Sequence, residues 1–328
     1  MDISWHQEFA TNWLARARQG RVPHAVLLTG PVGVGKRAAA GWMAAQHLGV
    51  STGASLPQYP PLAIEHADLR WIRPPVDKQA IGIDQIRGLV SELSLTSYQG
   101  GGKVAVIEPA DAMTGNAANS LLKTLEEPPG DALLILIADR KGHLPATIFS
   151  RCQRIGFAVP AEAEGLTWLD RLQPGQSWLA ALRLAGNAPL AAIDASSQLD
   201  THAAMSRDFA AVAAGKASAI AVAARWTALD TTFVLDWLAR QVQAAIFRAF
   251  GAPGPGALTA IEDSVLKRMD RRNLFCYLDI INRLRGQAGG SFNVHLTLEG
   301  LLIDLSEGLE DCGREVLAGE LPEMMVTR

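Results

Sequence analysis

The sequence has 328 residues, of which 48% are hydrophobic and 19% are charged, and its formal net charge is −3. A chain of this length and composition can bury large cores, so we expect a globular protein of two or three domains. The negative net charge argues against a protein that binds polyanions over most of its surface, so any contact with nucleic acid would be confined to a local patch. No stretch reaches the ~20 uninterrupted apolar residues of a membrane span, so we expect a cytoplasmic protein.

Strands and helices alternate in the first half of the chain. Short apolar runs typical of strands buried on both faces occupy residues 25–29, 103–107 and 132–138, and residues 68–74 are a weaker candidate. Apolar residues at helical spacing follow or precede these runs, in residues 36–48, 86–93 and 118–125. This alternation predicts right-handed βαβ crossovers and an α/β domain with a parallel sheet that spans residues 1–157.

The rest of the chain is rich in alanine and periodic at helical spacing. Two short helices are expected in residues 178–193, separated by Gly186 and Asn187, which favour a helix C-terminus. We expect a small helical domain over residues 158–205 and a second helical domain over residues 206–328. In the latter, apolar side chains line two helix faces, and the segment GAPGPGA at 251–257 separates them. These faces are Leu235, Leu238, Val242 and Ile246 in one helix, and Leu274, Leu278, Ile281 and Leu284 in the other.

Residues 30–37 read GPVGVGKR, between the first expected strand and the first expected helix. The phosphate-binding pattern G-x-x-x-x-G-K-[ST] wraps phosphates with backbone N–H groups, and its final hydroxyl ligates Mg²⁺. The loop residues expected to descend from such a site are Gly30, Gly33, Gly35, Lys36 and Arg37. A glycine-rich turn with no ligand is the alternative interpretation.

Two residues near this loop argue against nucleotide hydrolysis. Arg37 replaces the hydroxyl, and a guanidinium repels Mg²⁺. After the strand at 103–107, Glu108 could serve as a metal carboxylate, but Pro109 replaces the second acidic residue and cannot position a water molecule. Asp111 is interpreted as the N-cap of a helix that begins near Ala112.

The segments NSLLKTLEEPP at 119–129 and LPATIFSRC at 144–152 together resemble the clamp-loader family of AAA+ proteins. The resemblance is strongest over residues 20–157 and faint in NVHLTLEGLLIDL at 293–305. It implies a RecA-like AAA+ P-loop domain with a parallel sheet, then a small helical lid and an all-α C-terminal collar. The departures at the loop and the acidic pair are of the kind that marks a non-motor subunit of this family.

The resemblance assigns a role to Arg151. In the family, the arginine of the Ser-Arg-Cys motif reaches the ATP of a neighbouring subunit. A guanidinium there stabilises the charge that develops during hydrolysis, and arginine fingers in general raise the rate by a factor of about 10³ to 10⁵. A surface ion pair is the alternative role for Arg151. Cys152 is expected to be an inert buried residue and His24 a structural one.

Glu126 and Glu127 stand near the end of an expected helix, where their charges oppose the helix dipole. Basic groups of a partner and simple solvation are both candidates for the compensating interaction.

Two further departures from the family are visible. Pro189 stands where active relatives carry a lid arginine that touches the γ-phosphate. Some relatives carry a four-cysteine zinc module after the loop helix, and here Cys152, Cys276 and Cys312 are far apart while residues 48–67 read as a Pro/Gly-rich loop. We therefore expect no metal site, no zinc, no required cofactor, and at most weak ATP binding at the vestigial loop.

Taken together, the residues and the resemblance predict a subunit without ATPase activity of its own. Its expected partners are clamp-loader motor subunits and a delta subunit in a hetero-pentameric ring, the sliding clamp, and primer–template DNA bound through the complex, with no membrane partner. The collar would join the ring through the two amphipathic faces of its helices. Two alternatives stay open: an active AAA+ ATPase with an unusual Mg²⁺ arrangement, and a DNA-binding module that uses KRMDRRN at 267–273.

Overall fold

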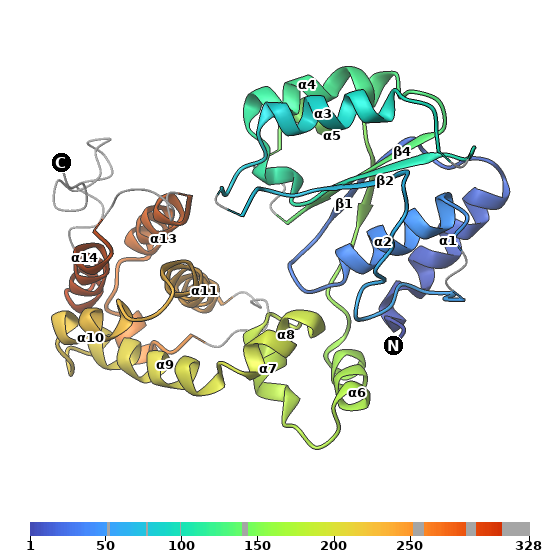
Figure 1. Ribbon diagram of the computed structural model, residues 1–328. Coiled ribbons are helices and arrows are strands. Elements are labelled where there is room, and N and C mark those ends of the chain that lie inside the picture. Colours follow the sequence, from blue (N-terminus) through green and yellow to red (C-terminus); the bar gives the residue numbers. More distant parts are fainter. Residues whose placement is uncertain are drawn as a thin grey trace. The chain divides into compact units, whose positions relative to one another are not determined.

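The computed structural model describes residues 1–50, 53–76, 78–98, 100–139, 144–251, 259–286 and 293–309. Its backbone packing divides the chain into two compact units, which Figure 1 shows. The first unit contains Met1–Leu182 and Asn187–Ile193, and the second contains Arg183–Gly186 and Asp194–Arg328. The expected division into three domains at residues 157 and 205 stays a prediction.

The first unit is built on a five-stranded parallel sheet with the strand order β2-β3-β4-β1-β5. The strands are β1 Ala25–Thr29, β2 Leu69–Ile72, β3 Lys103–Ile107, β4 Ala132–Ala138 and β5 Gln153–Gly156. Every residue of β1, β3 and β4 is buried, as the continuous apolar runs predict. The weaker candidate at 68–74 contains β2, and β5 was not predicted.

Helices cover both faces of this sheet (Figure 1). Alternate side chains of each strand point to opposite faces, so Leu27 packs in the core formed with α3 and α4, whereas Val26 and Leu28 pack in the core formed with α1 and α2. The helices of this part of the chain are η1 Ser4–His6, α1 Gln7–Arg18, α2 Lys36–His47, α3 Ile83–Leu93, η2 Ala110–Ala112, α4 Gly115–Glu126, α5 Ala146–Phe149, α6 Glu162–Leu172, α7 Trp178–Leu184 and α8 Pro189–Ser196. The expected α/β architecture is confirmed.

The helix after β3 begins later than predicted. Asp111 lies in the single 3₁₀ turn η2, and its carboxylate accepts a hydrogen bond from the backbone N–H of Asp139 at 3.2 Å. The N-cap of α4 is Thr114, whose hydroxyl accepts a hydrogen bond from the N–H of Ala117 at 3.2 Å. The interpretation of Asp111 as the N-cap was therefore wrong, because the chain is not α-helical until Gly115.

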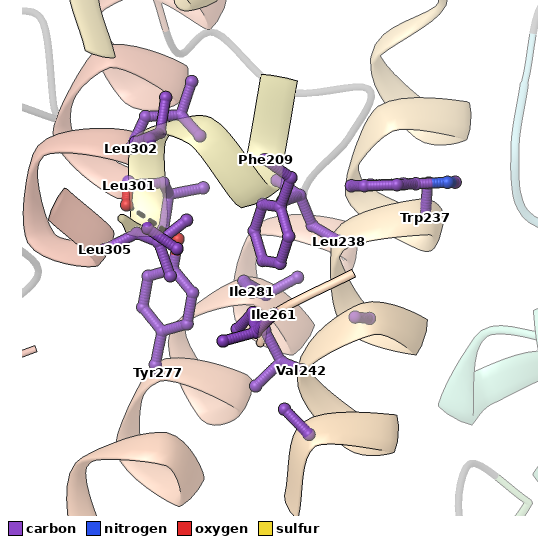
Figure 2. Packing of buried hydrophobic residues seen from close by; sticks show 14 of the residues in the cluster. Phe209, Trp237, Leu238, Val242, Ile261, Tyr277, Ile281, Leu301, Leu302 and Leu305 are labelled. Atoms are coloured by element: carbon purple, nitrogen blue, oxygen red, sulfur yellow. Dashed lines mark hydrogen bonds between the residues drawn. The ribbon is translucent and has the colours of Figure 1, made fainter. Parts of the chain in front are cut away.

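The described part of the second unit is helical. Its helices are α9 Leu199–Ala213, α10 Ala219–Trp226, α11 Thr231–Ala249, α12 Asp263–Leu266, α13 Arg271–Gly286 and α14 Val294–Ser306. Figure 2 shows the core that they share, in which Phe209, Trp237 and Tyr277 are fully buried. The hydroxyl of Tyr277 donates a hydrogen bond to the backbone oxygen of Leu301 at 2.7 Å.

The two amphipathic faces predicted for contact with other subunits lie inside this core. Leu235, Leu238, Val242 and Ile246 of α11 are buried, and so are Leu274, Ile281 and Leu284 of α13. These side chains join α11 to α13 within the unit, so the expectation that they meet a partner was wrong. The breaker segment at 251–257 lies outside the described residues except for Gly251. None of the described helices is both long and apolar enough to cross a membrane.

Candidate functional site

The glycine loop connects β1 to α2 at the carboxyl edge of the sheet, where parallel α/β sheets bind ligands. Its backbone requires glycine at three positions, of which Gly30 has a φ of +148°. Gly35 has a φ of +97° and precedes the first residue of α2. Gly33 has a φ of +83°, and a Cβ atom there would lie 2.4 Å from the Cβ of Ala191 in α8. The N–H of Leu190 donates to the oxygen of Gly33 at 3.0 Å, so α8 is attached to the loop.

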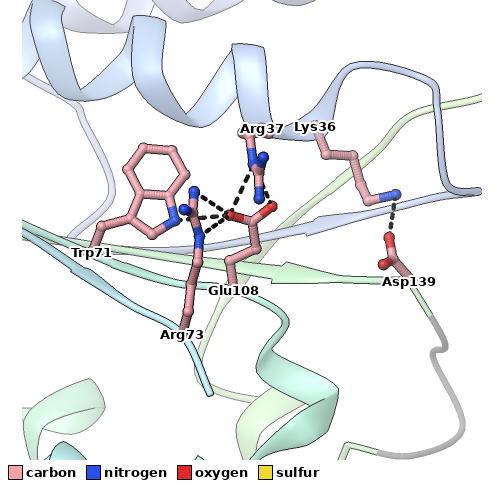
Figure 3. A network of polar contacts seen from close by, with 6 residues as sticks. All are labelled: Lys36, Arg37, Trp71, Arg73, Glu108 and Asp139. Carbon is pink, nitrogen blue, oxygen red and sulfur yellow. Dashed lines mark hydrogen bonds and ion pairs between the residues drawn. The ribbon is translucent and has the colours of Figure 1, made fainter. Parts of the chain in front are cut away.

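Lys36 is buried, and its ammonium group is fully engaged within the chain. Nζ donates to the backbone oxygens of Gly30 at 2.7 Å and Pro31 at 2.6 Å, and it lies 2.7 Å from Oδ1 of Asp139. An ammonium group has three hydrogen-bond donors, and these three acceptors account for all of them. Asp139 directly follows β4 and supplies the negative charge at this lysine (Figure 3).

Arg37 is paired with Glu108. Its Nε lies 2.8 Å and 3.1 Å from the two carboxylate oxygens of Glu108. The same carboxylate accepts hydrogen bonds from Arg73 Nε at 3.0 Å and from Trp71 Nε1 at 2.8 Å, as Figure 3 shows. Glu108 is thereby held by two guanidinium groups and an indole, and its side chain is only 15% exposed.

The residues of this loop do not fit a magnesium nucleotide. The position that needs a metal-binding hydroxyl carries the guanidinium of Arg37, and the carboxylate that could ligate the metal is bound by two cations. Lys36 has no N–H donor left for a phosphate, and the negative charge of Asp139 repels an anion placed beside it. The charges of Lys36 and Arg37 are therefore balanced by carboxylates of the same chain.

Asp139, Arg73 and Trp71 were not singled out from the sequence. Each stands at or just beyond the carboxyl end of a strand, which is the signal that could have marked Asp139 and Arg73. Trp71 lies within β2, where an aromatic residue is common and does not by itself indicate a site. Only the parallel order of β2, β3 and β4 brings these side chains to Lys36 and Arg37.

The N-terminal segment supports the loop from another side. Trp5 Nε1 and His6 Nε2 both lie 2.9 Å from the backbone oxygen of Val34, and the His6 ring lies beside Gly35. Burial lowers the pKa of His6 to about 4, while its hydrogen bond to Val34 acts in the opposite direction. His6 is therefore neutral near pH 7 and donates from Nε2, because a carbonyl oxygen only accepts. No pattern in the sequence indicated this contact.

Arg151 forms the surface ion pair that was its alternative role. Its Nε and Nη2 both contact Oε1 of Glu126, the former at 2.7 Å. Its Nη1 donates to the backbone oxygen of Thr147 at 3.1 Å and to the hydroxyl of Ser150 at 3.2 Å. Arg151 thus compensates the charge of Glu126 at the end of α4 within the same chain, and its described contacts do not include the glycine loop.

Other residues named from the sequence have structural environments. His24 Nε2 lies 2.8 Å from the backbone oxygen of Leu125, and Cys152 is a buried free thiol whose pKa is raised to about 12 by burial. Pro189 is the first residue of α8. In the segment at 267–273, Arg271 lies over the ring of Phe250 at 5.5 Å. Within the described ranges, no group of three or more metal-binding side chains is found.

The strand order, the loop between β1 and α2 and the helices on both faces are those of a RecA-like AAA+ fold. A DNA polymerase III gamma-subunit-related protein from Thermotoga maritima shares this fold, with a TM-score of 0.50 and 18% identity over 90% of this chain and 99% of that chain.

Sequence comparison identifies proteins that are similar to the N-terminal half of the chain. Residues 5–161 match the family described as DNA polymerase III, delta subunit. The chain is similar to DNA polymerase III subunit delta' of Pseudomonas aeruginosa, with 39% identity over 57% of this chain and 59% of that protein. It is also similar to subunit delta' of Escherichia coli, with 38% identity over 39% of each chain. These matches span less than two thirds of either relative. The N-terminal half of the chain is therefore similar to this family and to the delta' subunits of DNA polymerase III.

Proposed function

We propose that this chain is a non-hydrolysing, cytoplasmic subunit of the DNA polymerase III clamp loader. It works in a hetero-pentameric ring with motor subunits and a delta subunit, and it helps to load the sliding clamp onto primer–template DNA. In this role it splits no nucleotide of its own. It lends Arg151 to the ATP of a neighbouring motor subunit.

The observation that carries the first part of this proposal is the pairing of Arg37 with Glu108 (Figure 3). An active site of this class needs a cation between the loop and the acidic strand end, and it uses Mg²⁺ bound by a hydroxyl. Here a guanidinium that belongs to the chain stands between the same two elements. Pro109 removes the second acidic residue, and Pro189 removes the lid arginine, so three separate elements of hydrolysis are missing.

The second part rests on the placement of Arg151. Its side chain is 32% exposed, beyond α5 and beside the end of α4, and it is not used by the loop of its own chain. A planar guanidinium at a subunit boundary can make bidentate contacts with phosphate oxygens and stabilise the charge that develops there. Its neighbour therefore needs this chain for full ATP turnover.

A ring also needs apolar surface at which subunits meet. The aromatic side chains of Phe250 and Phe275 in the second unit are 53% and 50% exposed, and their ring centroids are 5.8 Å apart. An exposed pair of this kind suits a protein contact. We place the collar contact of the second unit at this pair instead of the buried faces of α11 and α13.

The test is to reconstitute the clamp loader with the Arg151→Ala variant and to measure ATP turnover in the presence of clamp and primed DNA. We expect turnover to fall at least tenfold while the subunits still co-elute as a ring. Arg154→Ala is the matched control, because Arg154 is an exposed arginine three residues further along the chain. The isolated wild-type chain should show no turnover with or without Mg²⁺.

Two results would contradict the proposal. Wild-type turnover by an intact ring that contains Arg151→Ala would remove the role of Arg151 in trans. Mg²⁺-dependent binding and turnover by the isolated chain would favour an active ATPase.

A further inference from the structure

Arg151 is held by contacts on two sides of its guanidinium group. Nη1 is fixed by the backbone oxygen of Thr147 and the hydroxyl of Ser150. Nε and Nη2 form the edge that binds carboxylates and phosphates in a bidentate manner, and here both contact Glu126. The edge that the proposed function requires for phosphate is therefore occupied by a carboxylate of the same chain.

From this geometry we propose that Glu126 masks Arg151 in the subunit and that the neighbour's ATP must displace Glu126 before Arg151 acts. This inference rests on the proposed function of Arg151 in trans. Glu126 is a positioning residue, because it acts on the neighbour's ATP only through Arg151. The phosphate and the carboxylate compete for one pair of N–H donors, so the masked and engaged states exclude each other.

The location of Glu126 explains why the mask is reversible. Glu126 is the last residue of α4, where the helix dipole disfavours a carboxylate, and Arg151 supplies the compensating charge. The side chains of Arg151 and Glu126 are 32% and 50% exposed, and water therefore screens their attraction. A surface pair of this kind shifts an equilibrium by no more than about fivefold, so a triphosphate with several charges can replace it.

The mask predicts a specific kinetic change. Glu126→Gln removes the charge of the competitor but keeps its size and its place in α4. In the reconstituted loader, we expect the ATP concentration at half-maximal turnover to fall about two- to fivefold while the maximal rate stays within a factor of about two. A structural role alone would lower the maximal rate or the yield of assembled ring.

Glu127→Gln is the matched control, since it makes the same change one residue further on. We expect it to leave the half-saturating ATP concentration unchanged. The double variant Glu126→Gln/Arg151→Ala should behave like Arg151→Ala alone, because the mask acts only through the arginine.

A second measurement follows the mask in the free subunit. Phenylglyoxal modifies accessible guanidinium groups, and mass spectrometry reports the modification of the peptide that contains Arg151. We expect Glu126→Gln to speed modification at Arg151 at least twofold, with no change at Arg154. Glu127→Gln should match the wild type at both positions.

The outcomes separate this inference from the proposed function. Wild-type turnover with Arg151→Ala would overturn both. A loss of turnover with Arg151→Ala, together with wild-type ATP dependence for Glu126→Gln, would overturn the mask alone. A lower maximal rate for Glu126→Gln would also overturn it, because Glu126 would then support Arg151 during turnover.

Discussion

At the scale of single residues, the glycine loop shows how a buried charge is balanced by groups of the same chain. Lys36 is only 5% exposed, and an unpaired ammonium group at such a place would be costly. Asp139 supplies the negative charge that a phosphate would otherwise bring, and the oxygens of Gly30 and Pro31 complete the hydrogen bonds. The charge and the hydrogen-bond donors of Lys36 are therefore matched within the chain.

This balance predicts a gain of nucleotide binding. Asp139→Asn removes the negative charge that repels phosphate and leaves Lys36 a neutral acceptor in place of its ion pair, so we expect ADP to bind the isolated chain about tenfold more tightly than it binds the wild type. Addition of Arg37→Thr restores a hydroxyl at the metal position. We expect ADP binding by this double variant, measured by calorimetry, to become stronger when Mg²⁺ is added.

The control for this gain is Asp131→Asn, which removes a carboxylate from the opposite end of β4. Its ADP affinity should equal that of the wild type. Equal affinities for Asp139→Asn and the wild type would show that the charge of Asp139 does not exclude phosphate.

At the scale of elements, continuous burial decided what the sequence could predict. The strands β1, β3 and β4 are buried on both faces, and their apolar runs gave the observed bounds. The short edge strand β5 has exposed residues at three of its four positions, so it has no apolar pattern to detect. It is a strand because it pairs with β1, which a local pattern cannot show.

The candidate site was also predictable only in part. The loop and Arg151 lie in continuous motifs, so their positions could be read from the sequence. Their partners Asp139, Glu108 and Glu126 come from other elements, and the fold alone determines which carboxylate meets which cation. The burial of both predicted collar faces in one core has the same origin, since a helix pattern marks an apolar face but not what covers it.

The contact between α13 and α14 yields a prediction for this element pair. Tyr277→Phe removes the hydrogen bond to Leu301 inside a fully buried core (Figure 2), so we expect the free energy of unfolding to fall by about 1 kcal/mol. Urea denaturation measures this change. Tyr98→Phe is the control, because Tyr98 is 72% exposed and its loss of a hydroxyl should change stability by less than about 0.5 kcal/mol. An equal effect of the two variants would contradict the role of the buried bond.

At the scale of the whole molecule, the two units have separate cores, and each unit has a buried histidine. Burial lowers the pKa of His6 in the first unit to about 4. The pKa of His202 in the second unit is also lowered to about 4, by burial first and then by the nearby charge of Arg240. Both imidazoles are neutral in the folded chain near pH 7, and both take up a proton more readily once the chain unfolds.

The shared direction of these shifts predicts that the protein loses stability in mild acid. Between pH 6.5 and pH 4 the unfolded chain binds more protons than the folded chain, so the free energy of unfolding falls as the pH falls through this window. Each histidine should contribute a loss of about 2 kcal/mol between pH 7 and pH 5, and neither should add any pH dependence above pH 7.5. Urea denaturation followed by circular dichroism at pH 7 and pH 5 measures this loss.

A variant assigns the effect to one unit. His202→Leu places an apolar side chain beside Phe233, whose ring lies 5.0 Å from that of His202. The variant also removes the imidazole that takes up the proton. We expect the difference in stability between pH 7 and pH 5 to shrink by about 2 kcal/mol in this variant. His295→Leu is the control, because the side chain of His295 is 42% exposed and its replacement should leave the difference unchanged. If His202→Leu kept the full wild-type loss, the acid sensitivity of the second unit would have to come from its carboxylates, because protonation of His202 would then cost the fold nothing.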